Sequence, residues 1–302
     1  MKSIAVSMIR GLMVLLSRLP LKLHYFMGDV ISWLAMNVFH YRTGVVWKNI
    51  SRSFPDMKYR ELRKVYKAFY KHFGEIFAEA VWFGGSSYRR LHDSGIVTVM
   101  NPEEISAIYE TSPSVTILST HCGNWELLGG LLGYRTPTGG RISFPEKAIS
   151  VVYKKLKNDV WDRVFALNRI APLTEVGTEC EVESANILRF AVRNKNEKRV
   201  YIYPTDQAPY YKSGPHPIGM FMHQETKAML GSVGVACMLS HAVVYMKMKR
   251  VERGRYEMSF IPICTDASTM KPEQIMRRYY DLLEEELNET PHNWLWTHNR
   301  WK

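Results

Sequence analysis

Short runs of β-branched and aliphatic residues alternate with longer amphipathic stretches from residue 114 onward, and this alternation constrains the fold more than any other feature. The runs that read as strands are residues 114–119, 149–153, 199–203, 242–249 and 256–263. Helices are expected over residues 59–82, 159–170, 185–192, 226–240 and 272–289. Strands that alternate with helices predict an α/β fold in which helices flank a central mixed sheet.

The chain begins with an apolar segment, residues 4–39, that charged residues and a proline interrupt at Arg10, Arg18, Pro20 and Lys22. A helix needs about 20 consecutive apolar residues to cross a bilayer, and neither half of this segment supplies them cleanly. Basic residues among Leu, Met, Ile and Trp favour helices that lie in the headgroup region of an anionic leaflet. A pair of ordinary buried helices and a single short anchor are the alternatives. We therefore predict a membrane-associated helical segment over residues 1–40 and one α/β domain over residues 41–302.

The chain carries a basic excess, with 40 Lys and Arg against 29 Asp and Glu. The net charge of +11 favours anionic partners such as lipid headgroups, phosphorylated glycolipids, acidic carrier proteins or nucleic acid. The basic residues are spread along the chain and form no run typical of a nucleic-acid-binding tail, so we expect no nucleic-acid partner. The 4 cysteines form no C-x-x-C pair, which argues against a zinc ribbon or a disulfide-stapled secreted fold and favours a reducing, cytosol-facing location.

The best candidate for chemistry is the segment Ser119-Thr120-His121-Cys122-Gly123-Asn124-Trp125-Glu126, which leaves the first predicted strand. On a continuous helix His121 and Glu126 would lie about 140° apart, so they meet only if the chain turns at Gly123. Asn124 is a plausible helix N-cap after that turn. If the two side chains meet, Glu126 fixes the tautomer of His121, and the other ring nitrogen can take a proton from an acceptor hydroxyl.

Other interpretations of this segment depend on the same residues. A zinc-peptidase site needs two histidines about four positions apart on one helix, and only one histidine is present here. The remaining histidines are too dispersed to predict a metal site. Cys122 has no identifiable partner for a nucleophilic role. A histidine at a strand end is also common as a structural residue, so the pattern by itself leaves that possibility open.

The order of several short motifs resembles that of the bacterial lipid A biosynthesis late acyltransferases, within the wider lysophospholipid acyltransferase superfamily. The motifs that carry the resemblance are Asn49-Ile50-Ser51-Arg52-Ser53-Phe54-Pro55, the H-x4-[D/E] block His121 to Glu126, Val152-Tyr153-Lys154 with Leu156-Lys157-Asn158, Arg169, Pro204-Thr205-Asp206-Gln207, and the terminus from Pro291 to Lys302. Together they cover nearly the whole chain.

The resemblance implies a glycerolipid acyltransferase-like fold and an enzyme of the inner membrane whose active site faces the cytoplasm. It implies transfer of a fatty acyl group from acyl carrier protein or acyl-CoA to a hydroxyl of a lipid acceptor, a lipid A precursor above all, with no cofactor. His121 and Glu126 are then the catalytic pair. Asn124, Lys154, Arg169 and Asp206 are predicted to bind substrate or to support the site. Capping or turn-forming roles are the alternatives for Arg169 and Asp206.

Two departures from the family pattern concern the acceptor. Lys154 stands where the family usually has Arg, and the two side chains do not bind a phosphate in the same way. His223 replaces the Gly of a common F-F-G element. The acceptor could therefore be another glycolipid or an amino-acid lipid. Two other function classes remain. One is a hydrolase, which would admit water to the acyl donor, and the other is a non-catalytic membrane- or nucleic-acid-binding protein.

Overall fold

The computed structural model describes residues 2–177, 180–209 and 214–301. Lys302, the last residue of the terminal motif, lies outside the described part of the chain. The helices are α1 (Lys2–Ser17), α2 (Leu21–Asn37), α3 (Thr43–Ser53), α4 (Tyr59–Phe83), α5 (Tyr88–Ser94), α6 (Pro102–Thr111), α7 (Asp159–Arg169), α8 (Ile187–Arg193), α9 (Gly231–Met238) and α10 (Pro272–Glu289). The strands are β1 (Val97–Val99), β2 (Val115–Ser119), β3 (Ile149–Tyr153), β4 (Glu181–Glu183), β5 (Val200–Pro204), β6 (His216–Phe221), β7 (Gln224–Ala228), β8 (Ala242–Glu252) and β9 (Arg255–Cys264).

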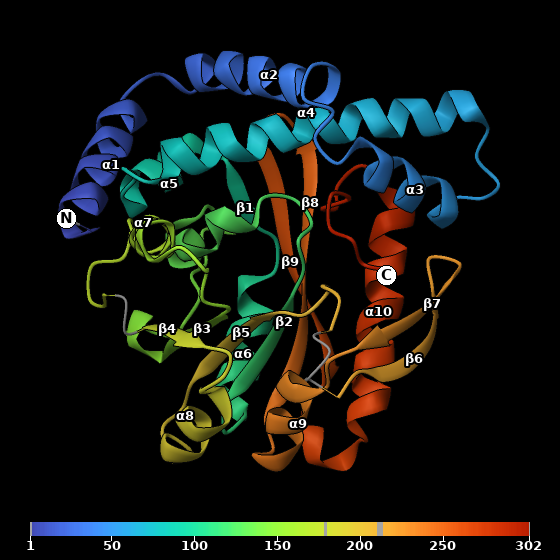
Figure 1. The fold of residues 1–302 in the computed structure, drawn as a ribbon. Helices are drawn as coiled ribbons and strands as arrows, with labels where there is room; N and C mark the ends of the chain where they lie inside the picture. Colours follow the sequence, from blue (N-terminus) through green and yellow to red (C-terminus); the bar gives the residue numbers. More distant parts are fainter. Residues whose placement is uncertain (1, 178–179, 210–213, 302) are drawn as a thin grey trace.

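A mixed seven-stranded sheet in the order β1-β9-β8-β2-β5-β3-β4 forms the centre of the molecule (Figure 1). Strands β8, β2, β5, β3 and β4 run parallel, whereas β9 is antiparallel to β8. The prediction of an α/β fold with a mixed sheet flanked by helices is confirmed. The parallel strands bring their carboxyl ends to one edge, where ligand sites of such sheets form.

The central strands are buried on both faces, because alternate side chains enter two separate cores. In β2, Leu118 packs with residues of α3, α9 and α10, whereas Val115 and Ile117 pack with residues of α5 and α6. Residues of β5 and β8 divide between the two cores in the same way. Burial on both sides explains why these strands appear in the sequence as apolar runs rather than as a strict alternation.

One predicted helix is wrong in its first part. Residues 226–240 were expected to be helical, but Gln224–Ala228 forms β7, and α9 begins only at Gly231. Strand β7 pairs with β6 in a two-stranded ribbon whose turn consists of Met222 and His223. Both turn residues have positive φ, 49° and 60°, a conformation that glycine adopts most easily. The His223 departure therefore lies in a hairpin turn.

Helices α1 and α2 pack against the α/β domain and bend by 117° relative to each other. Helix α2 lies along α4, and the two helices touch at Gly28 and Gly74 (Figure 1). A Cβ atom at Gly28 would lie 2.6 Å from the Gly74 carbonyl oxygen, so glycine permits this close approach. Among the described residues, no single helix is both long enough and apolar enough to cross a membrane. Of the helix pairs in that part of the chain, only α1 and α2 together have the required length and composition, and they are bent at the break between them.

Candidate active site

The pairing of β2 with β5 brings His121 and Asp206 together. Ser119 at the end of β2 lies beside Pro204 at the end of β5. His121 follows two residues after the end of β2, and Asp206 follows two residues after the end of β5. The carboxylate of Asp206 accepts from both the backbone N–H (3.0 Å) and the ring Nδ1 (2.7 Å) of His121. This two-point contact sets the orientation of the ring relative to the sheet edge.

Asp206 is a buried carboxylate that stays ionised. Its side chain is 2% exposed, and Trp294 Nε1 donates a further hydrogen bond of 2.6 Å to Oδ2. Burial by itself would raise the pKa of Asp206, but electrostatic attraction to His121 and the hydrogen bonds from His121 and Trp294 outweigh burial and lower that pKa to about 2. Because an ionised carboxylate only accepts, Nδ1 of His121 must carry the proton.

The second ring nitrogen of His121 is therefore a hydrogen-bond acceptor in the neutral ring. The side-chain nitrogen of Gln207, the next residue after Asp206, lies 3.0 Å from Nε2 and donates to it. The His121 side chain is 12% exposed. A neutral imidazole with an accessible Nε2 lone pair is the form that serves as a general base.

The structure corrects one part of the sequence prediction, because the carboxylate bonded to His121 is Asp206 rather than Glu126. Glu126 instead accepts from Nε (3.1 Å) and Nη2 (3.0 Å) of Arg169, a bidentate pair. It also accepts from Trp125 Nε1 at 3.1 Å, and the Trp125 ring lies 5.0 Å from the ring of His121. The predicted site residues thus form two adjacent pairs, His121 with Asp206 and Glu126 with Arg169.

The Arg169 guanidinium reaches the surface of the site. Its side chain is 34% exposed, whereas that of Glu126 is 11% exposed. Burial lowers the pKa of Arg169, but the charge of Glu126 and the hydrogen bonds to it raise that pKa above its ordinary value overall. Arg169 is therefore a permanent cation at the site, held in one orientation by Glu126.

Asn124 lies inside the turn that connects the two pairs. Its side-chain oxygen accepts from the backbone N–H of Glu126, which confirms the predicted N-cap; the helix that it caps is a 3-10 segment, Trp125–Gly133. The other end of its amide donates to Glu79 at 2.8 Å, and the residue is fully buried. These contacts position the turn; substrate binding by Asn124 stays a prediction.

Gly123 makes the turn possible. Its φ is +60°, and a Cβ atom there would lie 2.7 Å from the backbone oxygen of Met248. We expect Gly123→Ala to lower the free energy of unfolding by more than the about 1–2 kcal/mol that a left-handed backbone costs, because the Met248 overlap adds to it. It should also lower kcat by displacing His121.

Gly139→Ala is the matched control for this prediction. Gly139 also has a positive φ (+73°), but a Cβ atom there meets nothing within 4 Å. Denaturant unfolding of both variants separates the backbone cost from the overlap. Equal losses of stability would show that the contact with Met248 is unimportant.

Lys154 is exposed and follows β3, next to β5 in the sheet. Since Val151 of β3 lies beside Ile202 of the parallel β5, Lys154 leaves the sheet at the same edge as Asp206. It lies at the rim of this edge, and substrate binding by Lys154 stays a prediction.

The terminal motif packs beneath the Asp206 turn. Besides the bond from Trp294 to Asp206, Nε2 of His298 accepts from the backbone N–H of Ala208 at 3.0 Å. Asn49, from the first motif, donates to the backbone oxygens of Trp296 and His298. Trp294 is buried, and the sequence analysis did not predict its bond to Asp206. The role of Gln207 was missed too, although the P-x-D-Q motif contains it.

Two alternatives for the site fit the structure poorly. Cys122 is fully buried, and burial raises the pKa of its thiol well above the ordinary range, so it is not a thiolate nucleophile. Across the part of the chain that the structure describes, no cluster of three or more His, Cys, Asp or Glu side chains could hold a metal ion.

A family model of bacterial lipid A biosynthesis acyltransferases matches residues 1–302, the full length of the chain. The chain belongs to this family. This acyltransferase has no match in a search of curated protein sequences. Membership makes it a transferase of acyl groups in lipid A biosynthesis.

Proposed function

We propose that this acyltransferase moves a fatty acyl group from a thioester donor, acyl carrier protein or acyl-CoA, to a hydroxyl of a lipid A precursor, with His121 as general base. The observation that carries the proposal is the fixed state of the His121 ring, with Nδ1–H on Asp206 and a lone pair at Nε2. This geometry lies at the sheet edge of a chain that belongs to an acyltransferase family.

In the proposed reaction the acceptor hydroxyl takes the place of the Gln207 amide at Nε2. As the hydroxyl oxygen attacks the thioester carbonyl, its proton moves to Nε2, and Asp206 stabilises the imidazolium that forms. The tetrahedral intermediate then collapses with cleavage of the C–S bond. The leaving sulfur takes the proton from Nε2, which yields the ester and the free thiol and regenerates the neutral ring.

We assign Arg169 the binding of negative charge, either the acceptor phosphate or the developing oxyanion. Its guanidinium is a permanent cation that Glu126 orients from one side. Glu126 contributes to the reaction through this pair. Lys154 at the rim, exposed and basic, suits an anionic headgroup or an acidic carrier protein.

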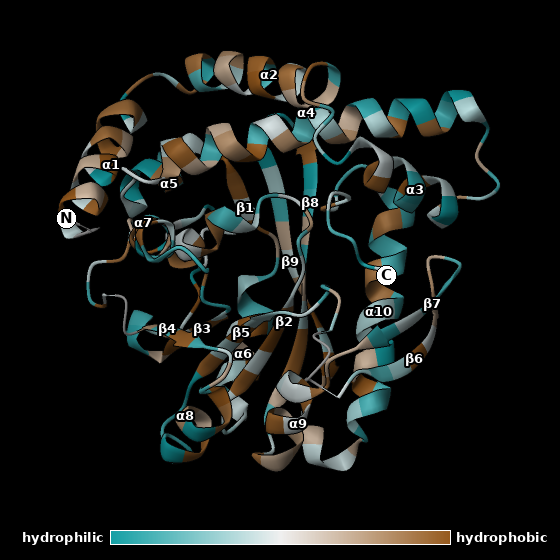
Figure 2. Ribbon diagram, in the orientation of Figure 1, coloured by the Kyte–Doolittle hydropathy of each residue, from teal (hydrophilic) through white to brown (hydrophobic). Residues whose placement is uncertain are grey.

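We further propose that α1 and α2 lie on the cytoplasmic face of the inner membrane. Figure 2 shows hydrophobic residues along both helices. The large apolar side chains that are exposed there include Ile4, Met8, Leu12, Leu15, Phe26, Ile31 and Trp33. Arg18, directly after α1, and Lys22, in the first turn of α2, are both exposed and lie at headgroup level in this arrangement. Arg10, expected among these basic residues, instead points inward and bonds to Asn168.

Lipid mass spectrometry tests the proposal in cells that lack the gene and carry either no copy, the wild-type copy or a His121→Ala copy. We expect one lipid class to lose the mass of a single acyl chain both without a copy and with His121→Ala. His92→Ala, which changes an exposed histidine, should restore that chain as the wild type does. The accumulated lipid identifies the acceptor.

An unchanged lipid profile, or full function of His121→Ala, would contradict the proposed reaction. Release of free fatty acid from the donor by the purified protein, without an acylated lipid, would indicate a hydrolase instead. Fractionation of the same cells tests the membrane assignment. Recovery of the protein outside the membrane fraction would contradict that assignment.

A further inference from the structure

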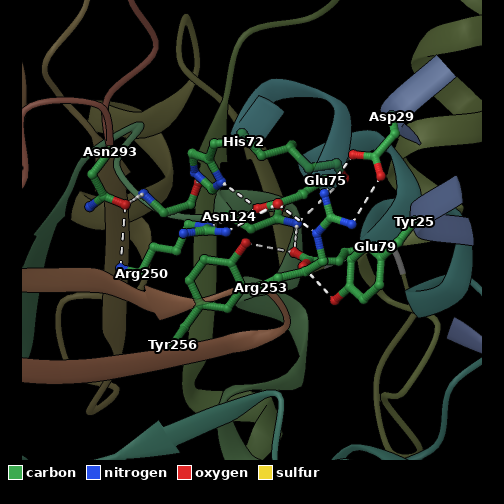
Figure 3. Close-up of polar contacts among 12 residues, drawn as sticks. Tyr25, Asp29, His72, Glu75, Glu79, Asn124, Arg250, Arg253, Tyr256 and Asn293 are labelled. Atoms are coloured by element: carbon green, nitrogen blue, oxygen red, sulfur yellow. Dashed lines mark hydrogen bonds and ion pairs between the residues drawn. The ribbon is translucent and has the colours of Figure 1, made fainter. Parts of the chain in front are cut away.

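A cluster of buried polar side chains joins α2 to the turn that carries His121 and Glu126, and the proposed reaction does not use it (Figure 3). At its centre is Glu79 of α4, whose side chain is fully buried. Its Oε1 accepts from the hydroxyl of Tyr25 in α2 at 2.8 Å. Its Oε2 accepts from Asn124 Nδ2 and from the Tyr256 hydroxyl, each at 2.8 Å.

Each of these contacts depends on the others. Glu79 receives three donors, which an acceptor-only carboxylate satisfies best. Burial raises the pKa of Glu79 to about 7, against the opposing effect of the three hydrogen bonds. The loss of one donor therefore weakens the hold of Glu79 on Asn124. Since Asn124 accepts from the backbone N–H of Glu126, the position of Glu126 depends on this chain of contacts.

A second contact runs from α1 to the other member of the same pair. Arg10 donates from Nη1 to the side-chain oxygen of Asn168 (2.8 Å) and from Nη2 to the backbone oxygen of Gly84 (3.0 Å). Asn168 is fully buried, donates to the backbone oxygen of Ala80 at 3.0 Å, and directly precedes Arg169. Helix α1 thus holds the end of α7 from which the Arg169 side chain extends.

We propose that Tyr25 and Arg10 are positioning residues, through which the two N-terminal helices hold the Glu126–Arg169 pair in its working geometry. The inference rests on the proposed function of that pair. It gives α1 and α2 a second role besides membrane contact, because their outward faces are apolar whereas Tyr25 and Arg10 lie on their inward faces. Displacement of a catalytic group by about 1 Å can cost up to about 10²-fold in rate.

The test uses the purified full-length protein in detergent, with an acyl-CoA series or acyl carrier protein thioesters as donors and lipid extracted from the deletion cells as acceptor. Tyr25→Phe and Arg10→Met should each lower kcat/KM for the acceptor by about tenfold or more, through kcat if Arg169 binds the oxyanion and through KM if it binds the acceptor phosphate. The KM for the donor should change by less than about twofold. The double variant should lose less than the product of the two single losses, because both act on one pair. Flotation with anionic phosphatidylglycerol vesicles should be unchanged.

Two further variants separate positioning from general loss of packing. Tyr70→Phe removes a hydroxyl of α4 that bonds to the backbone oxygen of Tyr41 and to neither Glu79 nor Asn168, and it should leave kcat/KM unchanged. Glu79→Gln, which keeps an acceptor for Asn124, should retain more activity than Glu79→Leu. Wild-type kcat/KM in both Tyr25→Phe and Arg10→Met would overturn the inference, as would an equal loss in Tyr70→Phe.

A measurement without substrate keeps the inference distinct from the proposed function. The indole N–H of Trp125 donates to Glu126, so its NMR resonance, assigned with Trp125→Phe, reports the position of that carboxylate. It should shift in Tyr25→Phe and Arg10→Met but not in Tyr70→Phe. An unshifted resonance overturns the inference. An inactive wild-type protein whose resonance shifts as expected in the variants overturns only the proposed reaction.

Discussion

Replacing Asp206 by asparagine is expected to lower kcat for acyl transfer by about 10³–10⁴-fold with the fold intact. The two N–H donors at Oδ2, from Trp294 and the His121 backbone, would keep the amide oxygen of the introduced asparagine facing them. The amide NH₂ would then face Nδ1 of His121 and donate to it. The ring proton would move to Nε2, which could no longer accept a proton from the acceptor.

The matched comparison is Glu126→Gln, because the sequence pattern by itself predicts Glu126 as the partner of His121. In the structure Glu126 bonds to Arg169, so this change should leave the His121 tautomer unaltered and weaken the orientation of Arg169. Nitrogen-15 NMR of the imidazole distinguishes the two cases. A tautomer change in Glu126→Gln and none in Asp206→Asn would refute the pairing of His121 with Asp206.

The largest loss of stability is expected from Glu75→Gln. Glu75 is 1% exposed and accepts from Arg250 (2.7 and 3.0 Å) and from Arg253 (2.8 Å), as Figure 3 shows. Removal of one partner from a buried ion pair leaves an uncompensated charge, which costs about 3–5 kcal/mol. For a chain of this size that corresponds to a Tm lower by roughly 5–15 °C in a thermal melt.

The pH dependence of this effect has a definite sign. Burial would raise the pKa of Glu75, but the nearby His72 ring (3.5 Å), the hydrogen bonds from Arg250 and Arg253 and the charge of Arg250 lower that pKa to about 2, from an ordinary value of 4.5. The stabilisation is therefore complete above pH 4.5 and is lost as the pH falls toward 2. The Tm difference between wild type and Glu75→Gln should shrink over that range.

An exposed ion pair provides the control for Glu75. Glu285 is paired with Arg278 on α10, with both side chains about half exposed, 60% and 48%. Glu285→Gln should change the free energy of unfolding by less than about 1 kcal/mol, because solvent screens such pairs. A similar Tm loss in both variants would contradict the argument from burial.

Sequence patterns predicted several elements closely because local interactions suffice to form them. Helix α10 spans Pro272–Glu289, as its amphipathic periodicity and its proline in the first turn indicated. Strand β3 likewise occupies Ile149–Tyr153. The error over residues 226–228 has the opposite cause. Strand β7 is stabilised by its pairing with β6. Local composition carries no information about this pairing, so it predicted a helix there.

The sequence by itself determined which side chains are available for chemistry and that a turn at Gly123 follows a strand. It also determined the family, because the order of the motifs along the chain carries that signal. It could not decide which carboxylate meets His121. Glu126 is five positions away, yet the bond goes to Asp206, 85 positions away, because β2 and β5 are neighbours and Ser119 lies beside Pro204. Strand order and register arise from packing between distant segments, so only the tertiary structure decided the partners of His121, Glu126 and Glu79.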